Sequence, residues 1–362
     1  MVAAISPTDT PEPPSHSPPR SSTGWDGKLR VERRPVIVNP EALSDPEYSD
    51  EEAPPVEQID ADEDLLDGVP EDEDQIDLVH CRISSIPALR LERFKQVERL
   101  CLRQNSISSI DFPSSLGPSL DELDLYDNLI SHIKGLDDLT SLTSLDLSFN
   151  KIKHIKRVSH LTQLKDLYFV QNKIQTISGL EGLSNLTNLE LAANRIRDIE
   201  NLETLTALEQ LWLGKNKITE IKGLKTLTNL TILSIQSNRL TSITGLCTLT
   251  NLTELHISHN QLTSLSGLEN NTALRVIDIS NNPISSLAGL GPLKVLEELW
   301  ASYCLVEDFA EVERELGDKE ELNTVYFEGS PLQTKGPVLY RNKVRLALPR
   351  VRQIDATFVK VD

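Results

Sequence analysis

Acidic and aromatic residues recur at one position of a repeated pattern in this chain. They stand 22 residues apart from Asp124 to Trp300, and Tyr326 follows 26 residues later. The column, here called the central column, reads Asp124, Asp146, Tyr168, Glu190, Trp212, Ser234, His256, Asp278, Trp300 and Tyr326. Carboxylates attract basic groups, and buried Trp and Tyr contacts often dominate protein recognition. This spacing therefore predicts a surface that binds a partner with basic groups.

A second column, two residues earlier in each repeat, strengthens this interpretation. It reads Glu122, Ser144, Asp166, Asn188, Gln210, Ile232, Glu254, Val276, Glu298 and Thr324. The two columns together hold eight carboxylates and no Lys or Arg, which disfavours nucleic acid because phosphate contacts need cations. An acidic face that is merely solvated is the alternative. Solvent gives no reason to gather Tyr168, Trp212, Trp300 and Tyr326 in one column, so a binding face is favoured.

The residues between these positions predict the elements that hold them. Ten copies of L-x-x-L-x-L-x-x-N-x-I/L begin at Leu120 and end with a stretched copy at Leu322, and two looser copies begin at Glu73 and Val97. This is the leucine-rich repeat, which predicts an α/β repeat solenoid, a right-handed horseshoe with a parallel β-sheet on its concave face. Each L-x-L pair enters the core, while the residue between the two leucines points outward.

The repeated Leu and Asn residues are expected to be scaffold, and catalysis has little support. Nine repeats carry Asn at the turn, and Cys81 and Cys304 take that position in two others, where buried thiols are expected. His256 and His259 lack metal-ligand spacing with Cys or a carboxylate. The chain has no Gly-rich phosphate loop and no G-x-S-x-G motif. We therefore expect neither enzyme activity, nor a metal site, nor a cofactor.

Composition divides the chain into three regions. Residues 1–72 are predicted to be a disordered acidic tail, because residues 41–77 hold seventeen Asp or Glu and no Lys or Arg. Residues 73–335 form the solenoid of about 12 repeats, and residues 336–362 form a cap over its end. Pro337, Tyr340, Val344, Leu346 and Leu348 indicate an amphipathic cap helix, with Val351, Ile354 and Phe358 packed behind it. Without a signal-like start or an apolar run of membrane length, a soluble intracellular protein with no membrane partner is expected.

Several segments resemble one family in particular. They are E-L-D-L-Y-D-N at 122–128, L-C-L-R-Q-N at 100–105, G-K-N-K-I-T at 214–219, S-N-R-L-T at 237–241, L-E-N-N at 268–271 and V-R-Q-I-D-A-T-F-V at 351–359. Over residues 74–362 the chain resembles the leucine-rich-repeat regulatory subunits of protein phosphatase 1, the regulatory subunit 7 family. The tail before residue 73 is similar only in being acidic.

The resemblance implies a non-enzymatic subunit of the nucleus and cytoplasm that grips the phosphatase catalytic subunit with its concave face. Whether a third regulatory subunit joins them is left open by the sequence. The family's contact residues then fall on Asp146, Tyr168, Glu190, Trp212, Asp278, Glu298, Trp300 and Tyr326. The chain lacks a basic-Val-x-Phe docking peptide, since Arg30-Val31-Glu32-Arg33 has no aromatic residue. The alternative is an intracellular repeat adaptor for another protein, like the spliceosomal, tubulin-folding or dynein-associated repeat proteins.

Overall fold

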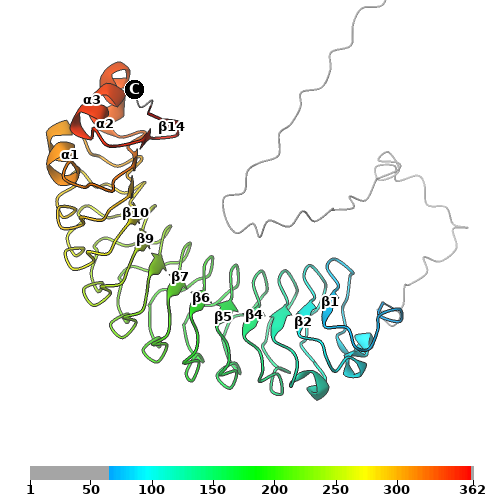
Figure 1. The fold of residues 1–362 in the computed structure, drawn as a ribbon. Coiled ribbons are helices and arrows are strands. Elements are labelled where there is room, and N and C mark those ends of the chain that lie inside the picture. Colours follow the sequence, from blue (N-terminus) through cyan, green and yellow to red (C-terminus); the bar gives the residue numbers. More distant parts are fainter. Residues whose placement is uncertain (1–64, 360–362) are drawn as a thin grey trace, which may run out of the picture. The chain divides into compact units, whose positions relative to one another are not determined.

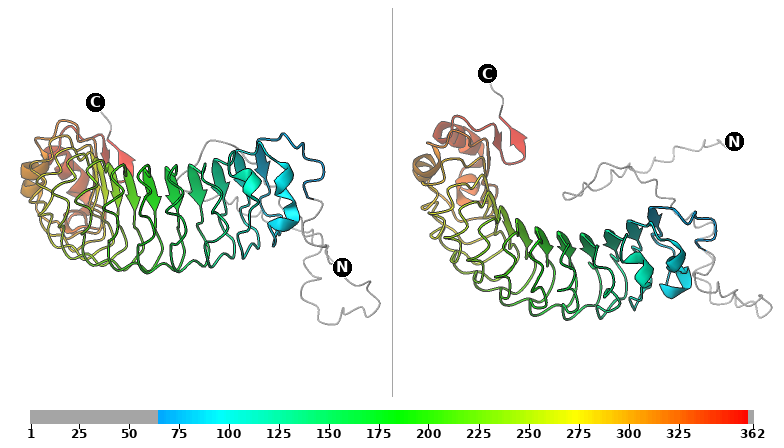
Figure 2. Two further views of the ribbon diagram at one scale, coloured as in Figure 1. Left: turned by 90° about the horizontal axis from the view of Figure 1, so that it is seen from below. Right: turned by 60° about the horizontal axis from the view of Figure 1, so that its bottom comes forward.

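The strands of this protein stack in sequence order into one sheet. A computed structural model describes residues 65–359. Within that range twelve three-residue strands pair in parallel from β1 to β12, and β13 and β14 close the sheet. The sheet lines the inside of the arc that the repeats form, and the connecting loops lie outside it (Figure 1). Two further views show the strands side by side along this inner surface (Figure 2). The predicted leucine-rich-repeat solenoid is confirmed.

Each of the strands β1 to β12 has a buried residue at its centre, as the repeat predicted, and the two-residue strands β13 and β14 belong to the cap. The strands are β1 Gln75–Asp77, β2 Arg99–Cys101, β3 Glu122–Asp124, β4 Ser144–Asp146, β5 Asp166–Tyr168, β6 Asn188–Glu190, β7 Gln210–Trp212, β8 Ile232–Ser234, β9 Glu254–His256, β10 Val276–Asp278, β11 Glu298–Trp300, β12 Thr324–Tyr326, β13 Gln353–Ile354 and β14 Thr357–Phe358.

Helices are few and lie at the two ends of the array. Short 3₁₀ turns occur at Pro87–Leu89, Leu91–Arg93 and Ser114–Leu116, among the first repeats. The longer step between Leu296 and Leu322 makes room for α1, Phe309–Leu316. Its N-cap is Asp308, whose carboxylate accepts from the Ala310 N–H at 2.9 Å. Helices α2, Pro331–Thr334, and α3, Pro337–Ala347, follow in the cap. None of the helices in the described range has the length and apolar character needed to span a bilayer.

Asparagines hold neighbouring repeats together just after each strand. The Asn194 amide accepts from the Ile174 N–H at 3.0 Å and donates to the carbonyls of Phe169 at 2.8 Å and Leu191 at 3.1 Å. The residue before each asparagine adopts a left-handed conformation, with φ of 55° at Ala193. That conformation is disfavoured for residues other than glycine, so the asparagine bonds must hold it in place. In the copy that begins at Leu296, Cys304 takes the asparagine position and is buried, and its thiol contacts the Ile279 carbonyl at 3.3 Å.

The cap covers the core of the final repeat. Tyr340, Val344, Leu348, Val351 and Ile354 are buried, as the amphipathic pattern predicted. The predictions for two other residues are wrong, because Leu346 is 80% exposed on the outer face of α3 and Phe358 is 76% exposed on the edge strand β14.

A buried carboxylate ties the cap to the last repeat. Asp355 accepts from the backbone N–H groups of Phe327 at 2.9 Å and Glu328 at 3.0 Å and from the Tyr340 hydroxyl at 3.1 Å. Cap and solenoid are therefore joined by polar bonds as well as by apolar packing.

The first repeat is also covered. Leu66, which the sequence assigned to the tail, is 2% exposed and belongs to the continuous core. Residues 1–64 of the predicted disordered tail lie outside the described residues. The covered core therefore extends from Leu66 through the cap.

Candidate functional site

Seven of the eight predicted contact residues lie in one row along the concave surface, and Glu298 stands beside that row, two residues before Trp300 in β11. Parallel pairing sets Asp146 beside Tyr168, Tyr168 beside Glu190, and Glu190 beside Trp212. Farther along, Asp278 pairs with Trp300, and Trp300 with Tyr326. All eight predicted residues are half-buried, because each side chain leans on its neighbours in adjacent strands. The structure therefore brings them together as one surface.

The row is interrupted near its middle. Ser234 is 1% exposed, and its hydroxyl donates to the Gln236 carboxamide, which lies over it. Ser148 and Ser258, each two residues after a member of the central column, are also buried. Small side chains sink between larger neighbours, so these positions offer little contact area. The concave surface is thus divided into an early part around Asp124 and a late part around Trp300.

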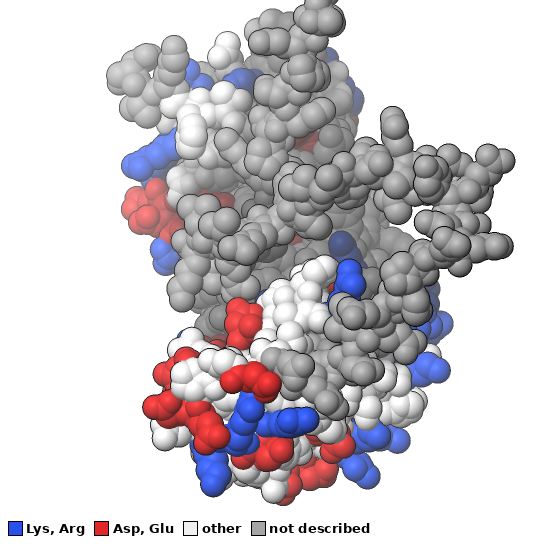
Figure 3. Space-filling view, turned by 90° about the vertical axis from the view of Figure 1, so that its right-hand side faces the viewer, with Lys and Arg blue, Asp and Glu red and all other residues white. Residues whose placement is uncertain are grey.

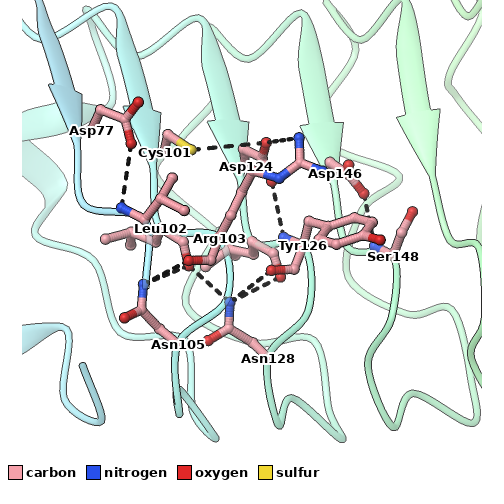
Figure 4. A network of polar contacts seen from close by, with 12 residues as sticks. Asp77, Cys101, Leu102, Arg103, Asn105, Asp124, Tyr126, Asn128, Asp146 and Ser148 are labelled. Carbon is pink, nitrogen blue, oxygen red and sulfur yellow. Dashed lines mark hydrogen bonds and ion pairs between the residues drawn. The ribbon is translucent and has the colours of Figure 1, made fainter. Parts of the chain in front are cut away.

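The early part contains a network that extends one repeat further than the predicted columns (Figure 4). Arg103 lies 3.2 Å from the Asp124 carboxylate, and its guanidinium stacks 4.2 Å from the centre of the Tyr126 ring. Tyr126 in turn packs against Phe149, with ring centroids 4.7 Å apart. Sequence reasoning missed Arg103 as a face residue. Extending the column analysis to the looser repeat at Val97 would have found it, because Arg103 follows the pair Leu100 and Leu102.

Burial changes the titration of the early carboxylates. It raises the pKa of Asp124 to about 6, helped by the negative charge of Asp146, and the nearby Arg103 only partly offsets this. Burial also raises the pKa of Asp146, and that of Glu190, for which the charge of Asp146 is a second cause. These groups are held where ionisation is costly, as expected of a surface that a cationic partner completes.

Several of the aspartates also support their own strands. One oxygen of Asp124 accepts from the Tyr126 N–H at 2.9 Å, and Asp146 binds the Ser148 N–H in the same way at 2.8 Å. Asp278 does so with Ser280 at 3.0 Å. Such bonds between a side chain and the backbone two residues on stabilise the turn after the strand. At Asp124 the second carboxylate oxygen faces Arg103 at 3.2 Å, so this side chain also holds the neighbouring network in place.

The middle of the row is held by polar contacts around Tyr168. The Asn188 amide donates to the Tyr168 hydroxyl at 3.1 Å, and that hydroxyl donates to Asp166 at 3.5 Å. Burial raises the pKa of Tyr168 to about 12, so the phenol stays neutral. Its ring is therefore fixed in orientation, which reduces the entropy lost when a partner covers it.

The late part is a cluster of three aromatic rings. His256 and Trp300 lie 6.3 Å apart and Trp300 and Tyr326 lie 5.8 Å apart between ring centroids, both edge-to-face. The Trp300 indole N–H donates to Glu298 at 3.0 Å, and the Gln353 amide of the cap donates to the Tyr326 hydroxyl at 2.7 Å. A shallow pocket lined by Ser280, Trp300, Ser302 and Tyr326 opens here. Fixed aromatic walls beside carboxylates suit an inserted cationic side chain.

The described residues offer no catalytic or metal-binding arrangement on this surface. His256 lies 3.5 Å from Glu254 and His259 contacts Asn281, so the two histidines have separate partners. Residues 65–359 contain no group of three or more His, Cys, Asp or Glu able to hold a metal ion.

Acidic and basic side chains are intermingled at the end of the array formed by the first repeats (Figure 3). The two concave columns defined above carry charged side chains of one sign, all of them acidic.

Comparison with known proteins identifies the family. A model of leucine-rich repeats, described as "Leucine Rich repeats (2 copies)", matches five overlapping segments between residues 162 and 294. The chain is 73% identical over 307 residues to protein phosphatase 1 regulatory subunit SDS22 of Schizosaccharomyces pombe, covering 84% of this chain and 92% of that protein. The chain belongs to the SDS22 family.

Other SDS22-family proteins match shorter segments. The protein of the same name from Saccharomyces cerevisiae is 46% identical over 87 residues, 24% of this chain and 26% of its own length. Human protein phosphatase 1 regulatory subunit 7 is 55% identical over 56 residues, 16% of this chain and 15% of its own length. The resemblance drawn from the sequence is confirmed at the level of the family.

Solved structures support the fold of this SDS22-family chain. An internalin, InlF of Listeria monocytogenes, superposes with a TM-score of 0.62 at 23% identity, over 79% of this chain and 87% of that one. The functional domain of InlJ from the same organism gives a TM-score of 0.58 at 21% identity, over 75% and 66% of the two chains. At this identity the likeness concerns the fold alone.

Proposed function

We propose that this chain is a non-enzymatic regulatory subunit that binds the catalytic subunit of protein phosphatase 1 through its concave row. The observation that carries the proposal is the alignment of acids and fixed aromatic rings along the concave surface, in a chain 73% identical to a protein named as a regulator of that phosphatase. The contact residues are Asp146, Tyr168, Glu190, Trp212, Asp278, Glu298, Trp300 and Tyr326. Through these contacts the subunit would control the activity, maturation or location of the bound enzyme.

The two parts of the row have different tasks in this proposal. Early carboxylates such as Asp146 and Glu190 attract basic groups on the catalytic subunit and orient its approach. The late cluster around Trp300 supplies apolar area and a pocket for one inserted side chain, which sets the dissociation rate. Tyr168 and Trp212 connect the two parts.

The partner itself can be tested by recovery from a cell extract. We expect the tagged full-length chain to recover the phosphatase catalytic subunit as its dominant partner, and Glu190→Lys to recover much less, because the reversed charge repels the same basic groups. Lys225→Glu, an exposed charge reversal outside the concave row, is the control and should recover the wild-type amount. Recovery of a different dominant protein would indicate an adaptor with another partner, and equal recovery by both variants would contradict the proposed face.

Binding should also weaken as the pH falls. With a pKa of about 6, Asp124 is almost fully ionised at pH 7.5 and mostly protonated at pH 5.5, so a partner that needs its charge loses about fourfold in affinity. The fold should not fail over this range. A carboxyl whose pKa is raised by folding destabilises the folded state when it is ionised. Protonation of Asp124 between pH 7.5 and pH 5.5 removes that destabilising charge, so this group makes the folded state more stable at the lower pH.

The measurement is a titration of the two purified proteins at both pH values, with Asp124→Asn as the control. The variant removes the titrating group but keeps its shape, so its affinity should depend less on pH than that of the wild type. Identical pH profiles for the two proteins would show that Asp124 does not contribute to binding through its charge.

A further inference from the structure

A column of cations lies along one edge of the solenoid, outside the concave row. It consists of the residue directly after the turn asparagine in five successive repeats. The members of this edge ladder are Lys151, Lys173, Arg195, Lys217 and Arg239. Each member is 22 residues from the next, and its side chain is exposed or half-buried. No acidic residue takes this position in any of the five repeats.

Backbone bonds hold the edge ladder in register. The N–H of Lys151 donates to the carbonyl of Ile130 in the preceding repeat at 2.8 Å, and Lys173, Arg195, Lys217 and Arg239 make the same bond, each at 2.8 Å. The charges are therefore stacked at the repeat spacing, about 4.8 Å per step, which makes the column about 19 Å long. Chain geometry brings these like charges together.

More cations extend the same edge. Lys153 and Arg197 follow their ladder residues at a distance of two, with a buried isoleucine between, so they point to the same outer side. Within residues 65–359 none of these seven side chains forms an ion pair. Elsewhere a lysine does find an acid one repeat away, as Lys222 does with Asp198 at 2.8 Å. From Lys151 to Lys217, the neighbour in the next repeat is always another cation.

We propose that the edge ladder binds an extended acidic segment of a partner protein, lying across the ends of strands β4 to β8. Adjacent like charges repel, and a run of carboxylates removes that repulsion while forming several pairs at once. An extended peptide advances about 3.3 Å per residue, so about six residues cover the column. Phe149, 39% exposed beside Lys151, offers an apolar contact at the early end.

A nucleic acid fits the edge less well. Single strands bind through aromatic side chains that stack on successive bases, and along this edge Phe149 is the one aromatic residue next to the ladder members. The acidic concave columns beside the ladder would also repel a long phosphodiester chain. A short acidic peptide can place its charges on the ladder alone, which favours a protein partner.

The test uses a fluorescein-labelled hexaglutamate peptide, titrated with the full-length chain at low ionic strength and followed by fluorescence anisotropy. We expect binding that weakens with added salt. The triple variant Lys173→Gln, Arg195→Gln, Lys217→Gln should lose roughly tenfold in affinity, as expected for three partly exposed charge pairs. The matched control Lys134→Gln, Lys165→Gln, Lys225→Gln makes the same charge change on exposed residues outside the ladder, and should stay within about twofold of the wild type.

Three outcomes would overturn the proposal. They are no binding of the peptide by the wild type, equal losses in the two triple variants, or tighter binding of an oligothymidylate of equal charge than of the peptide. Trp300→Ala, which alters only the concave row, should bind the peptide as well as the wild type does. The result is thereby separable from the proposed phosphatase binding, because either surface can fail its own test without the other.

Discussion

Trp300→Ala should weaken binding of the phosphatase catalytic subunit by about 2–4 kcal/mol, roughly 30- to 1,000-fold. Trp300 is the central ring of the late cluster, between His256 and Tyr326, and it lines the shallow pocket. Its removal deletes a large apolar contact and leaves Glu298 without its indole donor. Most of the loss should appear as faster dissociation, because the tryptophan acts after the two surfaces have met.

The measurement is the dissociation rate and equilibrium affinity of the purified complex by surface plasmon resonance. Leu346→Ala is the control, because Leu346 is 80% exposed on the cap, away from the concave row, and should bind like the wild type. Thermal unfolding of Trp300→Ala should stay near that of the wild type, since the ring is half-buried and no helix or strand depends on its hydrogen bond. A folded Trp300→Ala variant with wild-type affinity would remove the late cluster from the interface.

Leu189→Ala should reduce the free energy of unfolding by about 2–5 kcal/mol. Leu189 is the central residue of β6, is fully buried, and pairs with Leu167 and Leu211 in the neighbouring strands. A cavity there weakens the packing on both adjacent repeats, because each repeat is stabilised mainly by its two neighbours. Chemical denaturation followed by circular dichroism measures the effect.

Glu190→Ala provides the matched comparison, one residue along the same strand. Glu190 is half-buried on the concave surface, so its loss should change stability by no more than about 0.5 kcal/mol while weakening partner binding. Leu189→Ala should do the reverse, and the fraction that remains folded should bind like the wild type. Equal loss of stability in the two variants would contradict the division between core and surface that this strand predicts.

The repeat architecture and the positions of strands β1 to β12 could be predicted from the amino-acid pattern alone. Its period of 22 placed Leu189 inside and Glu190 outside correctly, because strand side chains alternate and every repeat must bury its leucines. The turn asparagines were equally readable, since their role needs only the adjacent repeats. The predicted contact residues do lie together on one surface, and their role in binding stays a prediction.

What lies on the exposed surface was decided by tertiary structure. Ser234 belongs to the outward column but is buried under Gln236, and Arg103 joins the face from a repeat whose leucine pattern is incomplete. The raised pKa of Asp124 likewise depends on neighbours from other repeats. The core repeats because packing imposes the same demand on every unit. The surface does not, because each exposed side chain is shaped by the particular residues beside it in the next strands.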